Sequence, residues 1–462
     1  MSKEKLLLTS MIAVISVIVY LTGKVMPMAS SVVMLLIFIG LYTWLLTLAM
    51  VHQKRMEIKR PKPINPAYAP RISIVISAHD EETVIEETVR HLMKLDYPNY
   101  ELLIVDDRST DSTPEILERL SRELPSSYRY VLRPADAFPG KPAVLNEALE
   151  LTDGEIICVF DADAHVEPDF LTKIVPYLED ENVGAVQARK VIANWRENWL
   201  TRCQNYEYSL DSNFQYGRDS VRGAVELRGN GQLVKREALE EVKGWNKHTL
   251  TDDLDLSTRL HIEGWDIRFA YKVTVFEEGI PEFDALLKQR RRWTEGTLFR
   301  YLEYAGPLLK SRKASLRTTL DMVAYFLEFL LPLWLVLDFI QLVVGFIFNN
   351  PAFTPFLSAL FGVKLVVSDP TFTHFLSSLL IVPVFSTGTC IALIVAIIRF
   401  NRPPVWEAIL WGIITGLYMT VLWFPMVFAI MVKVLFQKRR RTRWDKTRHT
   451  GAAHHSSSLG KA

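Results

Sequence analysis

The chain has 462 residues, of which 53 are lysine or arginine and 52 are aspartate or glutamate, so its formal net charge is +1. This length accommodates one large catalytic domain plus a membrane region. The balanced charge argues against a nucleic-acid-binding protein, which would usually carry an excess of basic residues. The three cysteines are far apart and lack CxxC spacing, which argues against a zinc site or a disulfide framework and fits a reducing compartment.

Two apolar runs open the chain. Residues 6–21 are uncharged but short for a span of about 20 residues, whereas residues 31–51 are long enough. No small-residue cleavage site follows the first run, so we interpret residues 1–60 as a transmembrane hairpin rather than a signal peptide. The stretch 52–62 is rich in lysine and arginine, which indicates the cytoplasmic side of the membrane. Prolines in residues 61–70 predict a linker.

Residues 71–305 alternate short β-branched runs with amphipathic helical stretches. Strands are predicted at 72–76, 102–105 and 156–160, and the helices that follow them at 82–95, 113–124 and 168–178. This alternation predicts βαβ units in a mostly parallel, mixed sheet, and hence an α/β domain. Ligands of such sheets bind beyond the carboxyl ends of the strands, so the chemistry is expected directly after each apolar run.

Apolar segments return near the C-terminus, at residues 322–348, 373–398 and 409–436. We expect interfacial and transmembrane helices over residues 306–437 and a basic cytoplasmic tail at 438–462, the end of which is predicted to be disordered. Three simple crossings would place this tail on the wrong side, so the first or the last segment is expected to hold an additional pass or an interfacial helix. The prediction is a multi-pass integral membrane protein whose catalytic domain is cytoplasmic.

Three pairs of aspartates stand at places where chemistry is expected. Asp106-Asp107 ends one strand, Asp161-Ala162-Asp163 ends another, and Asp252-Asp253 opens a later helix. An Asp-x-Asp after a buried strand places two hard oxygen ligands at a sheet edge, where they suit Mg²⁺ or Mn²⁺ together with substrate phosphates. The cation would neutralise charge that grows on a leaving nucleoside diphosphate. The alternative, that these aspartates merely cap helices, is disfavoured by the presence of three pairs in one domain.

Basic residues accompany the aspartates. Lys141 follows Gly140 at the expected start of a helix, where it would either meet a diphosphate or remain an ordinary surface lysine. The run Gln289 to Trp293 contains three arginines. It fits a solvated basic face, a patch at a membrane surface, or a platform that stacks a sugar and closes over a pyrophosphate.

In their order along the chain, these motifs resemble those of the inverting glycosyltransferase family 2, above all its membrane-bound branch of cellulose, chitin and hyaluronan synthases. The matching residues are Asp106-Asp107, Asp161-x-Asp163, Thr251-Asp252-Asp253 and Gln289-x-x-Arg292-Trp293. The resemblance implies that residues 71–305 form a GT-A-type domain that transfers a hexose from a UDP-sugar. His79-Asp80 departs from the Tyr-Asn of that branch, which puts the nucleoside contacts at this position in doubt.

The resemblance also implies a role for each motif. Asp253 would be the catalytic base that deprotonates the acceptor hydroxyl, and its neighbour Asp252 is expected to cap the helix that begins near Leu254, because adjacent helical side chains diverge by about 100°. Asp161 and Asp163 would hold the metal, Mg²⁺ or Mn²⁺. The implied donor-binding residues are Glu81, Asp107, Lys141, Asp161, Gln289, Arg292 and Trp293.

A narrower resemblance is to the members of this family that glucosylate diacylglycerol. It rests on residues 184–190, 194–199, 226–232, 251–256 and the tail motif 444–451. It implies UDP-glucose as donor, diacylglycerol in the lipid bilayer as acceptor, Mg²⁺ as cofactor, and a single β-linked glucose on the sn-3 hydroxyl.

Two other functions are less consistent with the sequence. A processive polysaccharide synthase would need a polar channel, but few acidic residues lie in or beside the C-terminal apolar segments, namely Glu328, Asp338 and Glu407. Such synthases also tend to have a Cys-Gly-Ser-like segment where this chain has residues 228–231. A non-catalytic membrane scaffold is disfavoured because Asp161, Asp163 and Asp253 are intact.

Overall fold

The computed structural model describes residues 3–25, 31–59, 65, 67–334, 336, 337, 340, 343 and 372–436. Residues 61–64 and 66 of the linker expected at 61–70 lie outside these residues, as do Asp338 and the tail expected at 438–462 with its 444–451 motif. The described chain forms two compact units, of which the larger contains Leu46–Met322 and Ala396–Val405. The remaining described segments form the smaller unit.

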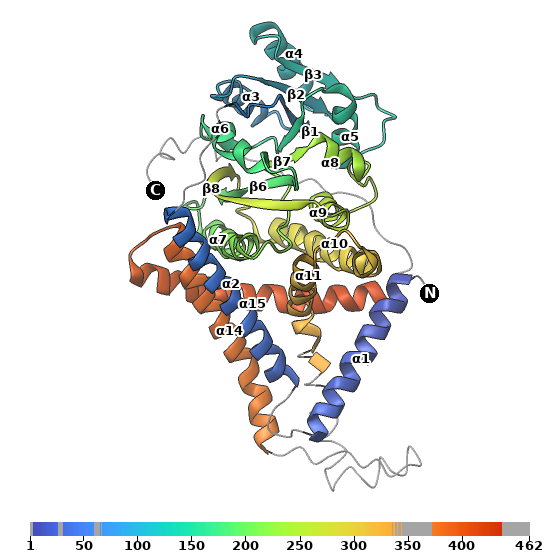
Figure 1. Cartoon of the computed structure of the whole chain (residues 1–462), viewed down its shortest axis with the longest axis vertical. Coiled ribbons are helices and arrows are strands. Elements are labelled where there is room, and N and C mark those ends of the chain that lie inside the picture. The colour runs from blue at the N-terminus through green and yellow to red at the C-terminus, as the bar shows by residue number, and fades with distance from the viewer. Residues whose placement is uncertain are drawn as a thin grey trace. The chain divides into compact units, whose positions relative to one another are not determined.

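The larger unit is built on an eight-stranded sheet with the strand order β3-β2-β1-β4-β7-β6-β8-β5 (Figure 1). The strands are β1 (Ile72–Ala78), β2 (Tyr100–Asp106), β3 (Tyr128–Leu132), β4 (Ile156–Phe160), β5 (His165–Val166), β6 (Val183–Ile192), β7 (Gln232–Lys235) and β8 (Asp266–Glu277). Strands β1 to β4 pair in parallel, as do β6 and β8, whereas β7 and β5 are antiparallel to their neighbours. The mostly parallel, mixed sheet predicted from the sequence is therefore confirmed.

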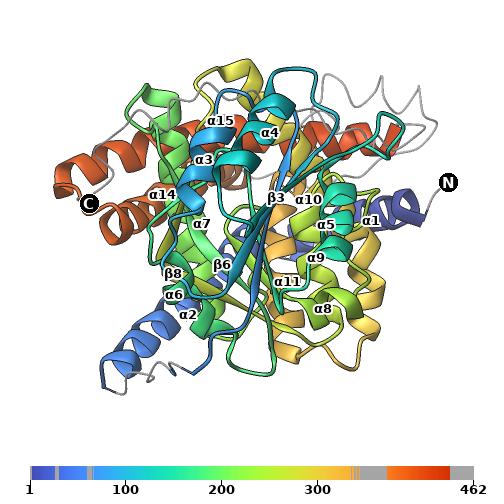
Figure 2. The same cartoon turned by 90° about the horizontal axis from the view of Figure 1, so that it is seen from above.

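Helices cover both faces of this sheet, as Figures 1 and 2 show. One face carries α3 (Ile85–Leu92), α4 (Thr113–Glu123) and α6 (Phe170–Ile174), which continues into the 3₁₀ helix Val175–Leu178. The other carries α5 (Lys141–Leu151), α8 (Arg236–Glu241) and α9 (Asp252–Ile262). The helices predicted at 82–95 and 113–124 are confirmed as α3 and α4, and the one predicted at 168–178 is divided between α6 and the 3₁₀ turn.

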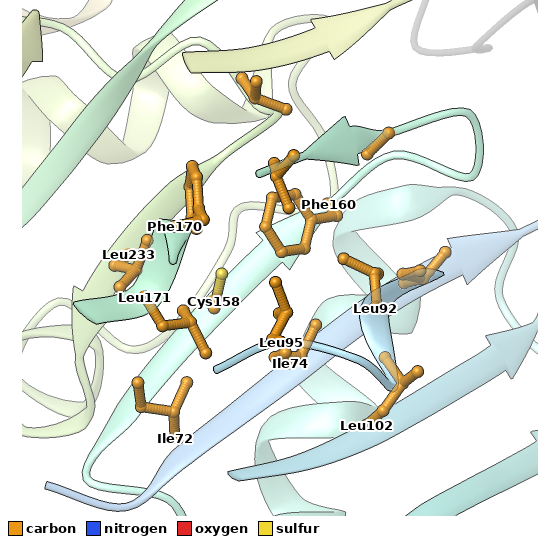
Figure 3. Packing of buried hydrophobic residues seen from close by; sticks show 14 of the residues in the cluster. Ile72, Ile74, Leu92, Leu95, Leu102, Cys158, Phe160, Phe170, Leu171 and Leu233 are labelled. Atoms are coloured by element: carbon orange, nitrogen blue, oxygen red, sulfur yellow. The ribbon is translucent and has the colours of Figure 1, made fainter. Parts of the chain in front are cut away.

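The strands alternate their side chains between two apolar cores. Ile72, Ile74 and Ile76 face the core beneath α3, whereas Val75 faces the core beneath α5. This follows from the two-residue period of a strand, and because both faces are covered the strands read as continuous apolar runs. Figure 3 shows Ile74 and Phe160 packed in the first core with the ring of Phe170 nearby. Burial of each such side chain contributes about 1.5–3 kcal/mol.

Two long polar helices complete the larger unit. They are α7 (Trp199–Ser220) and α10 (Phe283–Lys310). A capping box starts α7, because the Asn198 side chain accepts from the backbone N–H groups of Leu200 and Thr201. The helices bury charges as ion pairs, among them Arg290–Glu207 at 2.9 Å. A buried charge is tolerated when it is paired, so these contacts fix how the two helices pack.

The smaller unit is helical. It includes α1 (Lys3–Val25), the first part of α2 (Ser31–Lys59), and most of α14 (Phe372–Phe400) and α15 (Val405–Phe436). A Cβ atom on Gly412 would lie 2.4 Å from Ile394, and one on Gly416 would lie 2.4 Å from Cys390. Glycines four residues apart thus let α14 and α15 approach closely, as small residues do in membrane helices. Within the described residues, α15 is the one helix long and apolar enough to cross a membrane.

The ends of two apolar helices belong to the larger unit. From α2, Gln53 donates to Asp219 Oδ2 at 3.4 Å, and Glu57 forms an ion pair with Lys272 at 3.1 Å. Beyond α14, Asn401 Oδ1 accepts from Ser209 Oγ at 2.8 Å. Helix α7 therefore connects the catalytic sheet to the segments that lead into the apolar helices.

Candidate active site

The first part of the candidate site lies where β1 and β2 end. The two strands are in register there, and Asp107 N donates to Ala78 O at 2.7 Å. The turn after β1 carries Glu81, which is 7% exposed and whose backbone N–H donates to Thr113 Oγ1 at 2.8 Å. His79 Nδ1 lies 2.8 Å from Asp107 O. Two of the predicted donor-binding residues, Glu81 and Asp107, are thereby brought to one edge of the sheet.

The Asp107 carboxylate is firmly held. It accepts from Arg133 Nη1 at 2.6 Å, from Arg108 Nε at 3.0 Å and from Gly140 N at 2.8 Å. Burial by itself would raise the pKa of Asp107, but the hydrogen bonds from Arg108 and Gly140 and the charge of Arg133 lower it below the usual value. Asp107 thus stays ionised and fixes the loop that leads to Lys141.

The Asp-x-Asp motif directly follows β4. Asp161 forms an ion pair with Lys141, and its backbone N–H donates to Asn230 Oδ1 at 3.2 Å. Asp163 is 2% exposed and accepts from Glu278 N at 2.7 Å. Lys141 is therefore not an ordinary surface lysine, because its ammonium group lies against the first carboxylate of the motif.

These two carboxylates fit a divalent cation of the kind that also binds substrate phosphates. Among the described residues no group of three or more His, Cys, Asp or Glu side chains could hold a metal by itself. Mg²⁺ commonly takes one or two carboxylates and completes its shell with phosphates and water. The partly exposed Asp161 and the buried Asp163 supply that set of oxygens, with the remaining ligands left to a donor diphosphate.

The Thr251-Asp252-Asp253 motif starts α9. The N-cap is Thr251 and Asp252 is the first helical residue, so the expectation that Asp252 caps the helix was wrong. Its Oδ2 is buried without a hydrogen bond. Burial, and more weakly the charge of Asp253, raise the pKa of Asp252 to about 6 against the opposing effect of Lys141.

Gly229 lies close to both Asp253 and Lys141. A Cβ atom on Gly229 would lie 3.6 Å from Asp253 Oδ2 and 3.7 Å from Lys141 Nζ. Gly229 has a φ of +82°, which favours glycine. Burial by itself would lower the pKa of Lys141, yet the charges of Asp161, Asp252 and Asp253 raise it. The fold thus gathers the predicted base, the predicted diphosphate lysine and the Asp-x-Asp motif around one point.

The Gln289-to-Trp293 motif lies on α10 close to the same point. Gly296, one turn further along the helix, packs on Thr251, whose side chain would lie 2.4 Å from a Cβ atom there. Arg292 and Trp293 are partly exposed. Arg290, which sequence reasoning did not single out, is buried, pairs with Glu207 and lies 4.2 Å from the centre of the Trp293 ring.

A group of residues that sequence reasoning missed surrounds Glu277, at the end of β8. Its carboxylate pairs with Lys190 Nζ at 2.8 Å and accepts from Tyr208 OH at 2.6 Å and from Asn230 Nδ2 at 3.1 Å. Burial by itself would lower the pKa of Lys190, but the charges of Glu277, Asp161 and Asp253 raise it. The charges of Asp161 and Asp253 therefore act on a second lysine as well as on Lys141. Its signal in the sequence was weak, because a single lysine at the end of a strand is usually exposed.

The chain that follows Glu277 is held by amide side chains. Asn194 bonds to both the N–H and the C=O of Gly279, at 2.7 and 3.0 Å. Gln204 does the same for Ile280, at 3.0 and 2.7 Å. Because Glu278 N donates to Asp163, these clamps fix the position of the second carboxylate of the Asp-x-Asp motif. Sequence reasoning used residues 194–199 for a resemblance without finding this role.

The chain is similar to known proteins over most of its length. Residues 70–296 match the family described as "Glycosyltransferase like family 2". A β-monoglucosyldiacylglycerol synthase of Trichormus variabilis is 39% identical over 386 residues, which are 83% of this chain and 77% of that protein. A synthase of the same description from Synechocystis is 44% identical over 275 residues, 59% of this chain and 57% of that protein.

Solved structures support the fold. A mannosyltransferase from Pyrobaculum calidifontis, in complex with GDP-Man and Mn²⁺, has a TM-score of 0.54 and 22% identity, and the match covers 76% of this chain and 96% of that one. The likeness confirms the predicted GT-A-like α/β domain with its mixed sheet.

Proposed function

The chain belongs to glycosyltransferase family 2 and is a hexosyltransferase, and from this premise we propose that it transfers glucose from UDP-glucose to diacylglycerol. The observation that carries the proposal is the similarity to a β-monoglucosyldiacylglycerol synthase, which extends well beyond the catalytic domain. The gathering of Asp161, Asp252 and Asp253 around Lys141 supports it. The product is a β-linked monoglucosyldiacylglycerol.

The reaction we propose is a single displacement. Asp253 takes the proton from the sn-3 hydroxyl of diacylglycerol, and the oxygen forms a bond to the anomeric carbon on the face opposite UDP. The bond between that carbon and the diphosphate oxygen breaks, UDP leaves with the electron pair, and the α linkage becomes β. The position of the Asp253 carboxylate near Gly229 and Lys141 supports this role, because a base must lie within hydrogen-bond reach of the hydroxyl that it deprotonates.

Several groups of the candidate site would hold the donor. We propose that Glu81 and Asp107 bind the uridine, that Lys141 and Asp161 meet the diphosphate, and that Gln289, Arg292 and Trp293 line the donor site. The charge on Lys141 remains in place throughout because three carboxylates raise its pKa. A bound Mg²⁺ or Mn²⁺, held by Asp161 and Asp163, would supply positive charge to the leaving diphosphate.

The metal proposal is tested by chelation and by substitution. Asp161→Asn or Asp163→Asn should abolish transfer while the protein still folds, because each loses one anionic ligand. EDTA should do the same to the wild-type enzyme, and Mg²⁺ or Mn²⁺ should restore activity. Full activity in EDTA would end the metal proposal.

We further propose a multi-pass membrane protein with a cytoplasmic catalytic domain at residues 71–305. The hairpin would occupy residues 1–60 and further interfacial and membrane helices residues 306–437. The close glycine-mediated packing of α14 and α15 supports helices that meet in a bilayer. Protease added outside sealed, right-side-out vesicles should leave the catalytic domain intact, whereas cleavage there would invert the topology.

The activity itself is tested with membranes that contain the enzyme. Labelled UDP-glucose should yield a lipid-soluble product that co-migrates with β-monoglucosyldiacylglycerol and depends on added diacylglycerol. Label in a polymer would identify a polysaccharide synthase instead. An absence of incorporation from any UDP-sugar, in membranes where the folded protein is present, would indicate a scaffold.

A further inference from the structure

Arg189 on β6 is a partly buried cation without a counter-charge. Its Nε is buried, and no hydrogen-bond acceptor meets it in the described part of the chain. Its guanidinium carbon lies 5.3 Å from the centre of the Phe400 ring. Burial lowers the pKa of Arg189 to about 10, with no acidic group to oppose the effect. A partly buried guanidinium with no acidic group beside it is suited to bind an anion.

Three other buried or partly buried arginines of this unit are matched by carboxylates. Arg218 is 2.7 Å from Asp321, Arg268 is 2.6 Å from Asp219, and Arg133 is 2.6 Å from Asp107. At these three places the fold compensates a guanidinium that is removed from water, as the cost of burying a charge requires. Arg189 differs from all three, which indicates an external anion.

The surroundings of Arg189 are the end of an apolar helix. Phe400 is the last residue of α14, which has 29 residues. Arg399 donates to Asn213 Oδ1 at 2.6 Å, and Arg402 is exposed with a φ of +51°. Neither arginine has a carboxylate partner among the residues described, so three positive charges gather where α14 ends.

We propose that Arg189, aided by the charges of Arg399 and Arg402, binds a phosphate group of an anionic membrane lipid. The proposal rests on the membrane placement of α14 proposed above. The end of a membrane helix lies at the level of the lipid headgroups, where basic residues meet anionic lipids. A guanidinium suits phosphate because two of its N–H groups can donate to two oxygens of the same phosphate group. Diacylglycerol carries no phosphate, so the proposed anionic lipid is distinct from the acceptor. Free inorganic phosphate offers the same oxygens to a guanidinium, so it is the alternative ligand that the experiment must distinguish.

The proposed lipid site is connected to the candidate active site. Arg189 precedes Lys190, which pairs with Glu277. Ser209, which binds Asn401, follows Tyr208, which also binds Glu277. A lipid bound at Arg189 would therefore stabilise the positions of Lys190 and Tyr208, which both contact Glu277. We expect anionic lipid to increase glucosyl transfer without itself becoming glucosylated.

The test uses the full-length protein in lipid nanodiscs, either of phosphatidylcholine alone or with phosphatidylglycerol added. Phosphatidylglycerol should raise the Tm of the wild-type protein and remain bound in native mass spectrometry. Arg189→Met should lose both effects, with lipid binding at least about tenfold weaker. Arg196→Met is the matched control, because Arg196 also stacks on an aromatic ring, Trp195 at 4.6 Å, but should keep both effects.

The variants also separate lipid binding from a structural role. In phosphatidylcholine alone, Arg189→Met should be as stable as the wild type or more so, because it removes an uncompensated charge. A lower Tm there would show that Arg189 is structural and would overturn the proposal. If Arg189→Met does not fold, Arg402→Gln, at an exposed position, should still weaken binding of phosphatidylglycerol, and unchanged binding would overturn the proposal.

Two further arms identify the source of the phosphate and the link to catalysis. Inorganic phosphate added to phosphatidylcholine nanodiscs should not reproduce the rise in Tm, and a full effect of phosphate would overturn the lipid assignment. Lipid retention and Tm do not depend on turnover. Failure of the glucosyl transfer assay would therefore contradict the proposed function and leave the lipid site standing, whereas loss of lipid binding in the control variant would contradict the site alone.

Discussion

The two halves of the catalytic domain differ in the kind of side chain that they bury. Around β1, β2 and β4 the interior is mainly apolar, with side chains such as Ile74 and Phe160. Between α7 and α10 it contains charges, and Arg290 and Glu226 are 0% and 2% exposed. The apolar half can tolerate changes that preserve volume, because its attraction is non-directional. The ionic half depends on each partner being present, because a buried charge that loses its partner is costly.

The candidate site lies at the edge of both halves, and each half supplies different residues of the site. The apolar half supplies a rigid sheet, from which Asp107 and Asp161 emerge directly after strands. The ionic half supplies the groups that set their surroundings, among them Lys190 and Glu277. The comparison therefore predicts that ionic substitutions impair function or folding sharply, whereas conservative apolar substitutions have small effects.

The largest effect is expected for Asp253→Asn. The amide is nearly isosteric but has no useful basicity, so glucosyl transfer should fall by about a thousandfold, within the range of general-base catalysis. Titration of UDP into the purified variant in detergent should give nearly unchanged affinity. Asp252→Asn is the matched control and should retain most of its turnover. The opposite result, an active Asp253→Asn with an inactive Asp252→Asn, would reassign the base.

Next in size is the loss of a buried charge in Glu226→Gln. Glu226 pairs with Arg300, Arg218 and Arg228, so the substitution should reduce the free energy of unfolding by about 3 kcal/mol or more. Chemical denaturation measures this. Glu118→Gln, which removes an exposed partner of Arg122, should have no measurable effect, and equal losses in both variants would erase the distinction between the two halves.

The same carboxylate predicts a pH dependence. Burial by itself would raise the pKa of Glu226, but the charges of Arg300, Arg218 and Arg228 lower it far below its usual 4.5. Because the folded-state pKa is the lower one, this stabilisation is present above about pH 4.5 and is lost as the pH falls further. Glu226→Gln should therefore show a weaker loss of stability on acidification than the wild type.

A smaller effect is expected for Asn194→Ala, which releases Gly279 and so loosens the chain that binds Asp163. The metal concentration for half-maximal activity should rise about tenfold, which corresponds to about 1.4 kcal/mol, with little change in Tm. Asn182→Ala, at an exposed loop position, should change neither quantity. A lowered Tm with an unchanged metal requirement would show that the clamp is merely structural.

The smallest effect is expected in the apolar half. Ile74→Val removes one methylene group from a fully buried site and should cost about 1 kcal/mol of unfolding free energy with normal activity. Leu132→Val, at a side chain that is 47% exposed, should be close to neutral. A loss for Ile74→Val as large as that for Glu226→Gln would contradict the comparison.

Much of the apolar half could be predicted from the sequence. Apolar runs such as 72–76 and 156–160 predict buried strands, because both faces of a covered parallel sheet are apolar. The Asp-x-Asp at 161–163 and the aspartates at 252–253 could be recognised as candidate site residues for the same reason, since they stand where such elements end or begin. The ionic half gave no such signal. Arg290 was passed over in favour of Arg292 because a basic run does not reveal which arginine turns inward.

By itself, the sequence determined the α/β alternation, the order of the motifs and the positions at which carboxylates leave the strands, because these depend on local periodicity. The tertiary structure decided which charges meet. Lys190 and Glu277 lie far apart along the chain, and their pairing depends on how β6 and β8 align. Asn194 reaches Gly279 in the same way, and Arg189 lacks a carboxylate partner because no acidic side chain of the described fold comes to it. Pairing between distant residues is a property of packing, and spacing along the chain does not encode it.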